Sequence, residues 1–370
     1  GDFGLDFDIS GLADLSDEAF AQLEPQRWPL TAHRQGARFF ADGQFFHPDG
    51  KARMLPLHHR APATKRAPRY PFRLNTGRIR DQWHTMTRTG ISPRLSAHLA
   101  EPFADIHPED AAQLGVRTAD LLQLQSPHGR AILRARISAD VRPGDVFVPM
   151  HWTGECAPSA RVNALVTAAV DPVSGQPESK STVVAAERLK AAWYGFAVST
   201  RKMTPHAAYW AVAATQSGYR AELAGLEPLE DVADMARQMF DLPGADMQMV
   251  EDKSRGVARL ALHQDGKLAA ALFLAPEPVA VRRDYLASLP GSNVAGVLTG
   301  QPSADLPDPG PVICSCFNVG VNTILDAIET QGLLSVEQIG EALQAGTNCG
   351  SCRPEIANLI ARQSARHAAQ

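Results

Sequence analysis

The feature that most constrains this chain is a set of four cysteines close to its C-terminus. Cys314 and Cys316 form a Cys-x-Cys pair, and after a 32-residue spacer Cys349 and Cys352 form a Cys-x-x-Cys pair. Apolar residues of the spacer can build a small helical core that brings the two pairs together: Leu325, Ile328, Leu333, Val336, Ile339 and Leu343. Four converging thiols predict a metal site.

The cysteine spacing leaves more than one metal site open. Structural zinc usually takes two Cys-x-x-Cys pairs, so the Cys-x-Cys pair favours a [2Fe–2S] cluster, with zinc or four unrelated thiols as alternatives. Residues 335–338 predict a capping box at the start of a helix that Gly346 would close, and Pro354 suits the first turn of another helix. The second pair would then lie at a helix N-terminus, which favours thiolates.

The residues around both cysteine pairs resemble a known domain. The runs 312–320 (Val-Ile-Cys-Ser-Cys-Phe-Asn-Val-Gly) and 345–354 (Ala-Gly-Thr-Asn-Cys-Gly-Ser-Cys-Arg-Pro) are similar to the [2Fe–2S] domain of bacterioferritin-associated ferredoxin. Similar modules are appended to nitrite reductases and to assimilatory nitrate reductases, where they transfer electrons. The resemblance implies that Cys314, Cys316, Cys349 and Cys352 are the cluster ligands.

Length and composition exclude several classes of protein. A chain of 370 residues exceeds the usual size of one domain, so we expect two or three. The net charge of −4 and the pI near 6.3 give no global field for nucleic acid. Apolar runs such as 268–275 are too short to span a membrane, and no basic-then-apolar leader opens the chain. Clustered cysteines suit a reducing cytoplasm.

Residues 1–70 are expected to be the end of a preceding domain followed by a basic linker. Acidic residues dominate before Arg27, and a short helix is expected near 16–23. The phenylalanine pairs at 39–40 and 45–46 are expected to pack on a domain outside this chain. Residues 51–70 are basic and contain proline, which is typical of a linker, although contact with an anionic cofactor is an alternative.

A loop rich in hydrogen-bond donors follows an expected strand at 71–75. Residues 76–90 contain four threonines, three arginines, one histidine, one tryptophan and two glycines. Hydroxyls, guanidinium groups and backbone N–H groups beside glycine can together bind a large polyanionic heterocycle. A polar surface turn is the alternative.

This loop also carries a resemblance. The segment from 76–78, Thr-Gly-Arg, through 83–87, Trp-His-Thr-Met-Thr, is similar to the loop of molybdenum oxidoreductases that contacts molybdopterin guanine dinucleotide. The run 83–90, Trp-His-Thr-Met-Thr-Arg-Thr-Gly, is particularly similar to that of assimilatory nitrate reductases. The resemblance implies cofactor contacts at Thr76, Gly77, Arg78, Trp83, His84, Thr85, Asn163 and Lys180. The chain departs from the family at 150–152, Met-His-Trp, where a more apolar stretch is usual.

Residues 71–190 are expected to form the molybdopterin dinucleotide-binding β-barrel. The pattern predicts a strand ending near 106, a helix from Pro108 to Gly115, a hairpin at 121–137 and a strand at 146–149. The family's barrel has double-psi topology, which strand patterns do not predict. Cys156 could be a molybdenum ligand, but an ordinary free thiol is commoner and the family places that ligand in an earlier domain.

Residues 191–301 are expected to form a small α/β spacer or docking domain. We expect helices around 209–214 and 229–239 and a hairpin formed by 256–262 and 267–274. No glycine fingerprint for a dinucleotide is present. A proline-rich linker, 302–311, would then lead to the [2Fe–2S] domain, 312–370.

The two resemblances together imply a multidomain α+β protein, the C-terminal part of an assimilatory nitrate reductase. It would use bis(molybdopterin guanine dinucleotide) molybdenum and the cluster to reduce nitrate to nitrite in the cytoplasm, with ferredoxin, flavodoxin or an NADH-linked reductase subunit as donor. The molybdenum ligand and a [4Fe–4S] cluster are expected in an N-terminal part, so this chain alone should be inactive. Alternatives are another molybdopterin oxidoreductase, such as a formate dehydrogenase, and a non-catalytic electron-transfer or zinc module.

Overall fold

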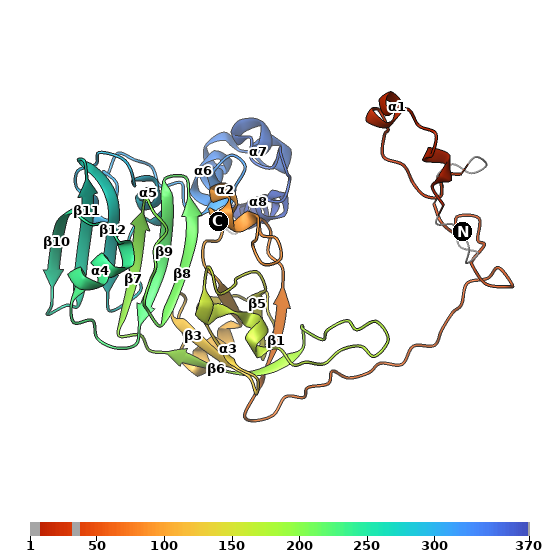
Figure 1. Ribbon diagram of the computed structural model, residues 1–370, viewed down its shortest axis with the longest axis horizontal. Helices are drawn as coiled ribbons and strands as arrows, with labels where there is room; N and C mark the ends of the chain where they lie inside the picture. The colour runs from red at the N-terminus through yellow and green to blue at the C-terminus, as the bar shows by residue number, and fades with distance from the viewer. Residues whose placement is uncertain (1–7, 32–37, 369–370) are drawn as a thin grey trace. The chain divides into compact units, whose positions relative to one another are not determined.

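The chain divides into a short N-terminal unit, residues 1–61, and a larger unit, residues 62–370. The computed structural model describes residues 8–31 and 38–368 (Figure 1). Among these residues no helix has the length and apolar character needed to cross a membrane.

The N-terminal unit has little regular structure. Its α1 (Asp17–Ala21) begins where the Ser16 hydroxyl accepts the Ala19 N–H, which confirms the expected short helix. Phe40 stacks on Phe45 with ring centroids 4.8 Å apart. These two phenylalanines therefore contact each other, and their packing on a further domain stays a prediction.

Six strands of the larger unit close into a barrel in the order β1, β5, β2, β4, β3, β6. They are β1 (Phe72–Gly77), β2 (Phe103–Ile106), β3 (Leu121–Gln125), β4 (Arg130–Ile137), β5 (Asp145–Pro149) and β6 (Thr182–Leu189). Alternating side chains such as Leu74, Leu122, Leu124 and Leu133 fill the interior. The pairs β1–β5 and β2–β4 are parallel, whereas β3 and β4 form the expected antiparallel hairpin.

Local sequence sets the limits of α3 (Pro108–Leu114), which lies between β2 and β3. Pro108 occupies the first position, and the His107 side chain accepts the Glu109 N–H. Gly115 ends the helix at φ 63°, a left-handed conformation that glycine adopts at low cost. The helix predicted from Pro108 to Gly115 is confirmed.

A second sheet has six strands in the order β10, β11, β12, β7, β9, β8, and every neighbouring pair is antiparallel. The strands are β7 (Trp193–Ser199), β8 (Tyr209–Thr215), β9 (Gly218–Gly225), β10 (Asp246–Asp252), β11 (Val257–Gln264) and β12 (Lys267–Ala275). Along β12, Leu272 and Leu274 pack with α4 (Val232–Phe240), while Phe273 packs with α5 (Arg283–Ser288). One helix therefore lies on each face of this antiparallel sheet.

The helix expected around 209–214 is wrong, because these residues form β8. Alanine favours helices in isolation. Here the segment pairs with β9 along its whole length and buries Tyr209 completely, and such tertiary packing outweighs propensity. The expectations for α4 and for the β11–β12 hairpin are confirmed.

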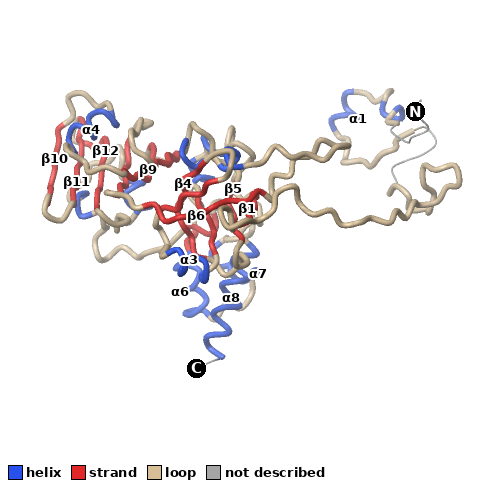
Figure 2. The backbone as a smooth tube through the Cα atoms, turned by 90° about the horizontal axis from the view of Figure 1, so that it is seen from below, coloured by secondary structure: helices blue, strands red, loops and turns tan. Residues whose placement is uncertain are grey.

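The cysteine segment forms a small body with helices α6, α7 and α8 (Figure 2) and a two-stranded sheet. Its elements are β13 (Val312–Cys314), β14 (Val319–Gly320), α6 (Val321–Gln331), α7 (Val336–Leu343) and α8 (Arg353–Ala368). Ser335 and Gln338 form the predicted capping box, and Ile328 and Ile339 lie in the predicted core. The predicted terminator of α7 is wrong, since Gln344 at φ 59° ends the helix two residues before Gly346.

Candidate functional site

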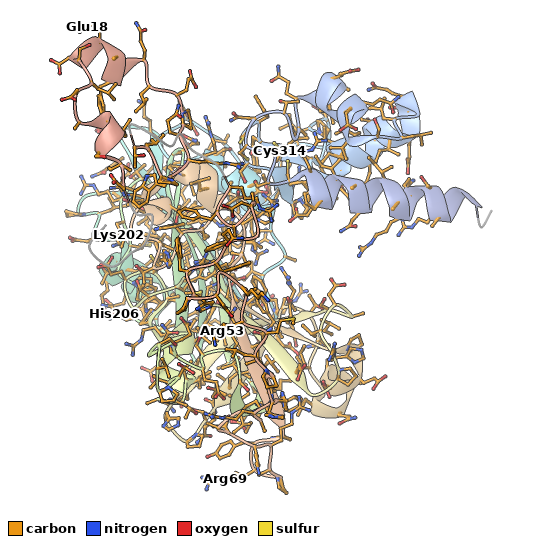
Figure 3. All side chains as sticks on the ribbon, turned by 90° about the vertical axis from the view of Figure 1, so that its right-hand side faces the viewer. Glu18, Arg53, Arg69, Lys202, His206 and Cys314 are labelled. Carbon is orange, nitrogen blue, oxygen red and sulfur yellow. The ribbon has the colours of Figure 1, made fainter. Side chains whose placement is uncertain are left out.

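The fold brings the four cysteines together as two sulfur pairs. Cys316 Sγ lies 3.4 Å from Cys349 Sγ, and the Cys314 thiol is close enough to Cys352 to raise the pKa of that thiol. Cys314 is carried by β13, and Cys352 directly precedes α8. Figure 3 shows Cys314 on the side of the helical segment that meets the rest of the unit.

The two pairs differ in their surroundings. Cys314 and Cys352 are buried, and burial together with the neighbouring thiol raises the pKa of Cys352 to about 12. Cys349 is exposed, and its pKa is lowered by hydrogen bonding to the Ser351 hydroxyl. The apolar core therefore encloses one pair while solvent reaches the other.

The choice between the candidate metals rests on the cysteine spacing. Four thiolates can hold one zinc ion, or a [2Fe–2S] cluster with two thiolates on each iron. The Cys-x-Cys pair of Cys314 and Cys316 favours the cluster, since structural zinc usually takes two Cys-x-x-Cys pairs.

The loop 76–90 leaves the barrel at the end of β1, beside the end of its parallel partner β5. The Thr76 hydroxyl donates to the Ser179 carbonyl at 3.0 Å, and Lys180 Nζ donates to the Thr76 carbonyl at 3.0 Å. Gly77 lies against a ring, because an added Cβ would come within 2.6 Å of Phe147 Cε2. The structure thus places Thr76, Gly77 and Lys180 together.

The tip of this loop presents donors to solvent. Arg78, Trp83, His84 and Thr85 are exposed, and the Trp83 and His84 rings meet edge to face at 4.3 Å. Asn163 has a different setting, exposed in the 3-10 helix Val162–Leu165. Exposed guanidinium, hydroxyl and aromatic groups on one loop are the chemistry that an anionic dinucleotide requires.

A cavity of about 580 Å³ lies beside the loop. Its lining includes Thr85 and Thr87 of the loop and Cys156 and Lys202 across from them. Burial raises the pKa of Cys156, so this thiol is neutral at physiological pH.

His151 is a residue that the sequence did not single out as a site residue. It is fully buried, its Nε2 accepts the Ile79 N–H at 3.0 Å, and its Nδ1 pairs with the His84 carbonyl at 2.8 Å. Since Nε2 accepts, the proton lies on Nδ1 and the imidazole is neutral. Burial lowers its pKa, which maintains that state. One imidazole thereby hydrogen-bonds to both ends of the loop segment 79–84.

Arg80 and Asp81 were also missed. These two loop residues face away from the exposed donors and contact Ser315, Ser351 and Glu355 of the cysteine segment. Both residues lie in the loop 76–90, but neither was assigned a role of its own from the sequence, and their partners lie more than 230 positions away in the chain.

Comparisons with protein families agree with both resemblances. Residues 72–183 match the family described as molydopterin dinucleotide binding domain, and residues 312–362 match the BFD-like [2Fe-2S] binding domain. The chain therefore contains a molybdopterin dinucleotide binding domain and a BFD-like [2Fe–2S] binding domain, as its motifs predicted.

Several curated proteins are similar to this chain. A nitrate reductase of Klebsiella oxytoca is 38% identical over 370 residues, covering 97% of this chain and 41% of that protein. The assimilatory nitrate reductase catalytic subunit of Bacillus subtilis is 33% identical over 181 residues, covering 47% and 25%. The F420-dependent formate dehydrogenase subunit alpha of Methanocaldococcus jannaschii is 33% identical over 163 residues, covering 44% and 24%. The chain thus spans less than half of each relative.

Proposed function

We propose that this chain is the C-terminal part of a molybdenum-dependent nitrate reductase. The observation that carries the proposal is the placement of two cysteine pairs against the loop of a dinucleotide-binding barrel. Support for the substrate comes from the nitrate reductase of Klebsiella oxytoca, whose match covers 97% of this chain. In the proposed reaction of the whole protein, nitrate takes up two electrons and two protons and yields nitrite and water.

Each cofactor has proposed ligands in this chain. Thr76, Gly77, Arg78, Trp83, His84, Thr85, Asn163 and Lys180 would bind the dinucleotide part of bis(molybdopterin guanine dinucleotide) molybdenum. Cys314, Cys316, Cys349 and Cys352 would bind the [2Fe–2S] cluster. When bound, the molybdenum centre supplies oxygen-atom transfer and the cluster supplies single-electron chemistry. The protein residues bind and orient these groups, and none of them is assigned a catalytic role.

The proposal extends to the division of the chain. We assign residues 71–190 to the barrel, 191–301 to a spacer or docking domain, 302–311 to a linker and 312–370 to the cluster domain. Double-psi topology for the barrel is supported by the two parallel strand pairs, which a simple up-and-down barrel lacks.

The donor and location are also proposals. A cytoplasmic ferredoxin, flavodoxin or NADH-linked subunit would supply the electrons, since ligand cysteines must stay reduced before a cluster is inserted. Nitrate reduction by the chain alone is not expected, because the chain spans only 41% of the nitrate reductase of Klebsiella oxytoca and the family resemblance implies a molybdenum ligand in another part of the protein. A dye-linked nitrate assay on the purified chain tests this point.

Formate oxidation is the alternative that a specific observation favours, because one relative is a formate dehydrogenase subunit. The full-length protein, purified with its cofactors, should reduce nitrate with a reduced dye and should not reduce an oxidised dye with formate. The reverse result would replace nitrate with formate as the substrate.

Metal analysis of the chain tests the cluster assignment directly. Anaerobically purified protein should contain about two irons per chain and little zinc. Zinc in place of iron, reproduced under anaerobic conditions, would overturn the electron-transfer function. Retained molybdenum would support cofactor binding by the loop 76–90.

A further inference from the structure

Arg80 holds two segments of the cysteine domain at once. Its Nε and Nη2 atoms donate to the two carboxylate oxygens of Glu355, each at 2.8 Å, and Nη2 also donates to the Ile313 carbonyl at 2.6 Å. Ile313 directly precedes Cys314, and Glu355 lies three residues after Cys352. A single half-buried guanidinium therefore holds the strand that carries one cysteine and the helix that follows another.

Asp81 reaches the interior of both cysteine motifs. Its Oδ2 accepts the Ser315 hydroxyl at 2.9 Å, and its Oδ1 accepts the Ser351 hydroxyl at 3.3 Å. Arg80 Nη1 donates to the same carboxylate, and His98 Nδ1 lies 3.4 Å from it. Only 6% of the Asp81 side chain is exposed, so its charge is poorly screened by water.

The positions of the two serines make this contact informative. Ser315 separates Cys314 from Cys316, and Ser351 separates Cys349 from Cys352. Ser351 Oγ also lies 3.1 Å from Cys349 Sγ, and either atom of this contact can be the donor. One hydroxyl therefore links the Asp81 carboxylate to Cys349, and the carboxylate itself lies beside the residues between both cysteine pairs.

We infer that Arg80 and Asp81 hold the cluster domain, residues 312–370, on the loop 76–90, and that Asp81 lowers the reduction potential of the cluster. We call these two residues the seat of the cluster domain. The second half rests on the proposed function, since it requires a [2Fe–2S] cluster on the four cysteines. Cluster potentials depend on nearby charge and on hydrogen bonds to the sulfurs. A fixed negative charge close to the cluster stabilises its oxidised form.

The seat also links the two proposed cofactor sites. Arg80 and Asp81 lie between Arg78 and Trp83 in the same loop, and these flanking residues are the proposed dinucleotide contacts. Holding the cluster domain on this loop therefore fixes the distance between the cysteines and whatever the loop binds.

Potential measurements on the full 370-residue chain test the role of Asp81. Iron content and the electron paramagnetic resonance signal of the reduced cluster first establish that each protein carries the cluster. A redox titration should then give D81N a more positive midpoint potential than the parent, while D81E stays closer to the parent. D326N is the matched control, because it removes an exposed carboxylate from α6 of the same domain and should leave the potential unchanged.

Backbone hydrogen exchange tests the seat without any metal. R80Q should raise exchange rates at least tenfold in 312–320 and 349–356, whereas R362Q, which removes an exposed arginine of α8, should not. Equal hydrogen-exchange rates in R80Q and the parent would show that Arg80 does not hold the cluster domain on the loop. Equal midpoint potentials in D81N and D326N would show that Asp81 does not lower the reduction potential. A parent without iron would overturn the cluster assignment and the tuning with it, while the exchange experiment would still decide the seat.

Discussion

Glu222 of β9 is the centre of a buried ion-pair network that joins the barrel to the second sheet. Its oxygens accept from Arg283 Nε at 2.6 Å and Arg283 Nη2 at 3.0 Å, and from Arg220 at 3.2 Å. Arg134 of the barrel strand β4 lies 3.8 Å away and pairs with Glu101. We expect Glu222→Gln to destabilise the larger unit strongly.

The size of the effect follows from burial. Only 4% of the Glu222 side chain is exposed, and removing one partner from a buried ion pair costs about 3–5 kcal/mol because the other charges stay desolvated. For a cooperative unit of this size, 1 kcal/mol corresponds to about 2–4 °C in Tm. The variant should therefore melt roughly 6–20 °C below the parent at neutral pH.

A matched substitution separates the effect of burial on stability from the effect of losing one charge. Glu277 pairs with Arg117 at 2.9 Å, but the two side chains are 67% and 64% exposed. Exposed pairs contribute at most about 1 kcal/mol, so Glu277→Gln should shift Tm by no more than a few degrees. Scanning calorimetry of both variants at one scan rate compares them directly.

The pH dependence supplies a second check. Burial alone would raise the pKa of Glu222, but Arg283, Arg220 and Arg134 outweigh it and the pKa is lowered. The charged carboxylate therefore contributes stability that is full above its ordinary pKa and is lost as the pH falls through the lowered value. Equal Tm shifts for the two variants at pH 7, or a difference that does not shrink as the pH is lowered through the acid range, would refute the reasoning.

Three further outcomes are expected. Cys352→Ser should lose most of the bound iron whereas Cys156→Ser should retain it, as measured by metal analysis of the purified proteins. Burial lowers the pKa of His151, so its neutral form contributes stability that is full above its ordinary pKa of 6.5 and is lost as the pH falls below that value. Between pH 8 and pH 5, the measured Tm should therefore fall less in His151→Gln than in the parent. Gly225→Ala would bring its Cβ within 2.3 Å of the Trp193 ring and should cost about 1–3 kcal/mol by calorimetry.

Local signals in the sequence predicted most elements of the fold. The capping box at Ser335, the proline start and glycine end of α3, and the β11–β12 hairpin each depend on contacts within a few residues, so the pattern is enough. The prediction for β8 was wrong because its alanines do not indicate a strand, and its conformation is decided by pairing with β9.

The candidate site was likewise predicted from the sequence only in part. Cysteine spacing predicted which thiols gather, but it could not say that they form two pairs, because that depends on how β13 meets the start of α8. His151 was visible only as a departure from the family, and its role requires the fold to bring Ile79 and His84 to the two sides of one ring.

The loop 76–90 shows why the remaining residues were missed. The composition of the loop does not show which way its arginines and polar side chains point. From the sequence, the whole loop was therefore assigned to one anionic ligand. The structure separates them: Arg78 and Trp83 are exposed, while Arg80 and Asp81 turn into the cysteine domain. The contact between Arg80 and Glu355 spans 275 positions and leaves no periodic or spacing signal. A donor-rich loop with two faces can therefore serve two sites at once, and only the three-dimensional arrangement assigns each donor to its side.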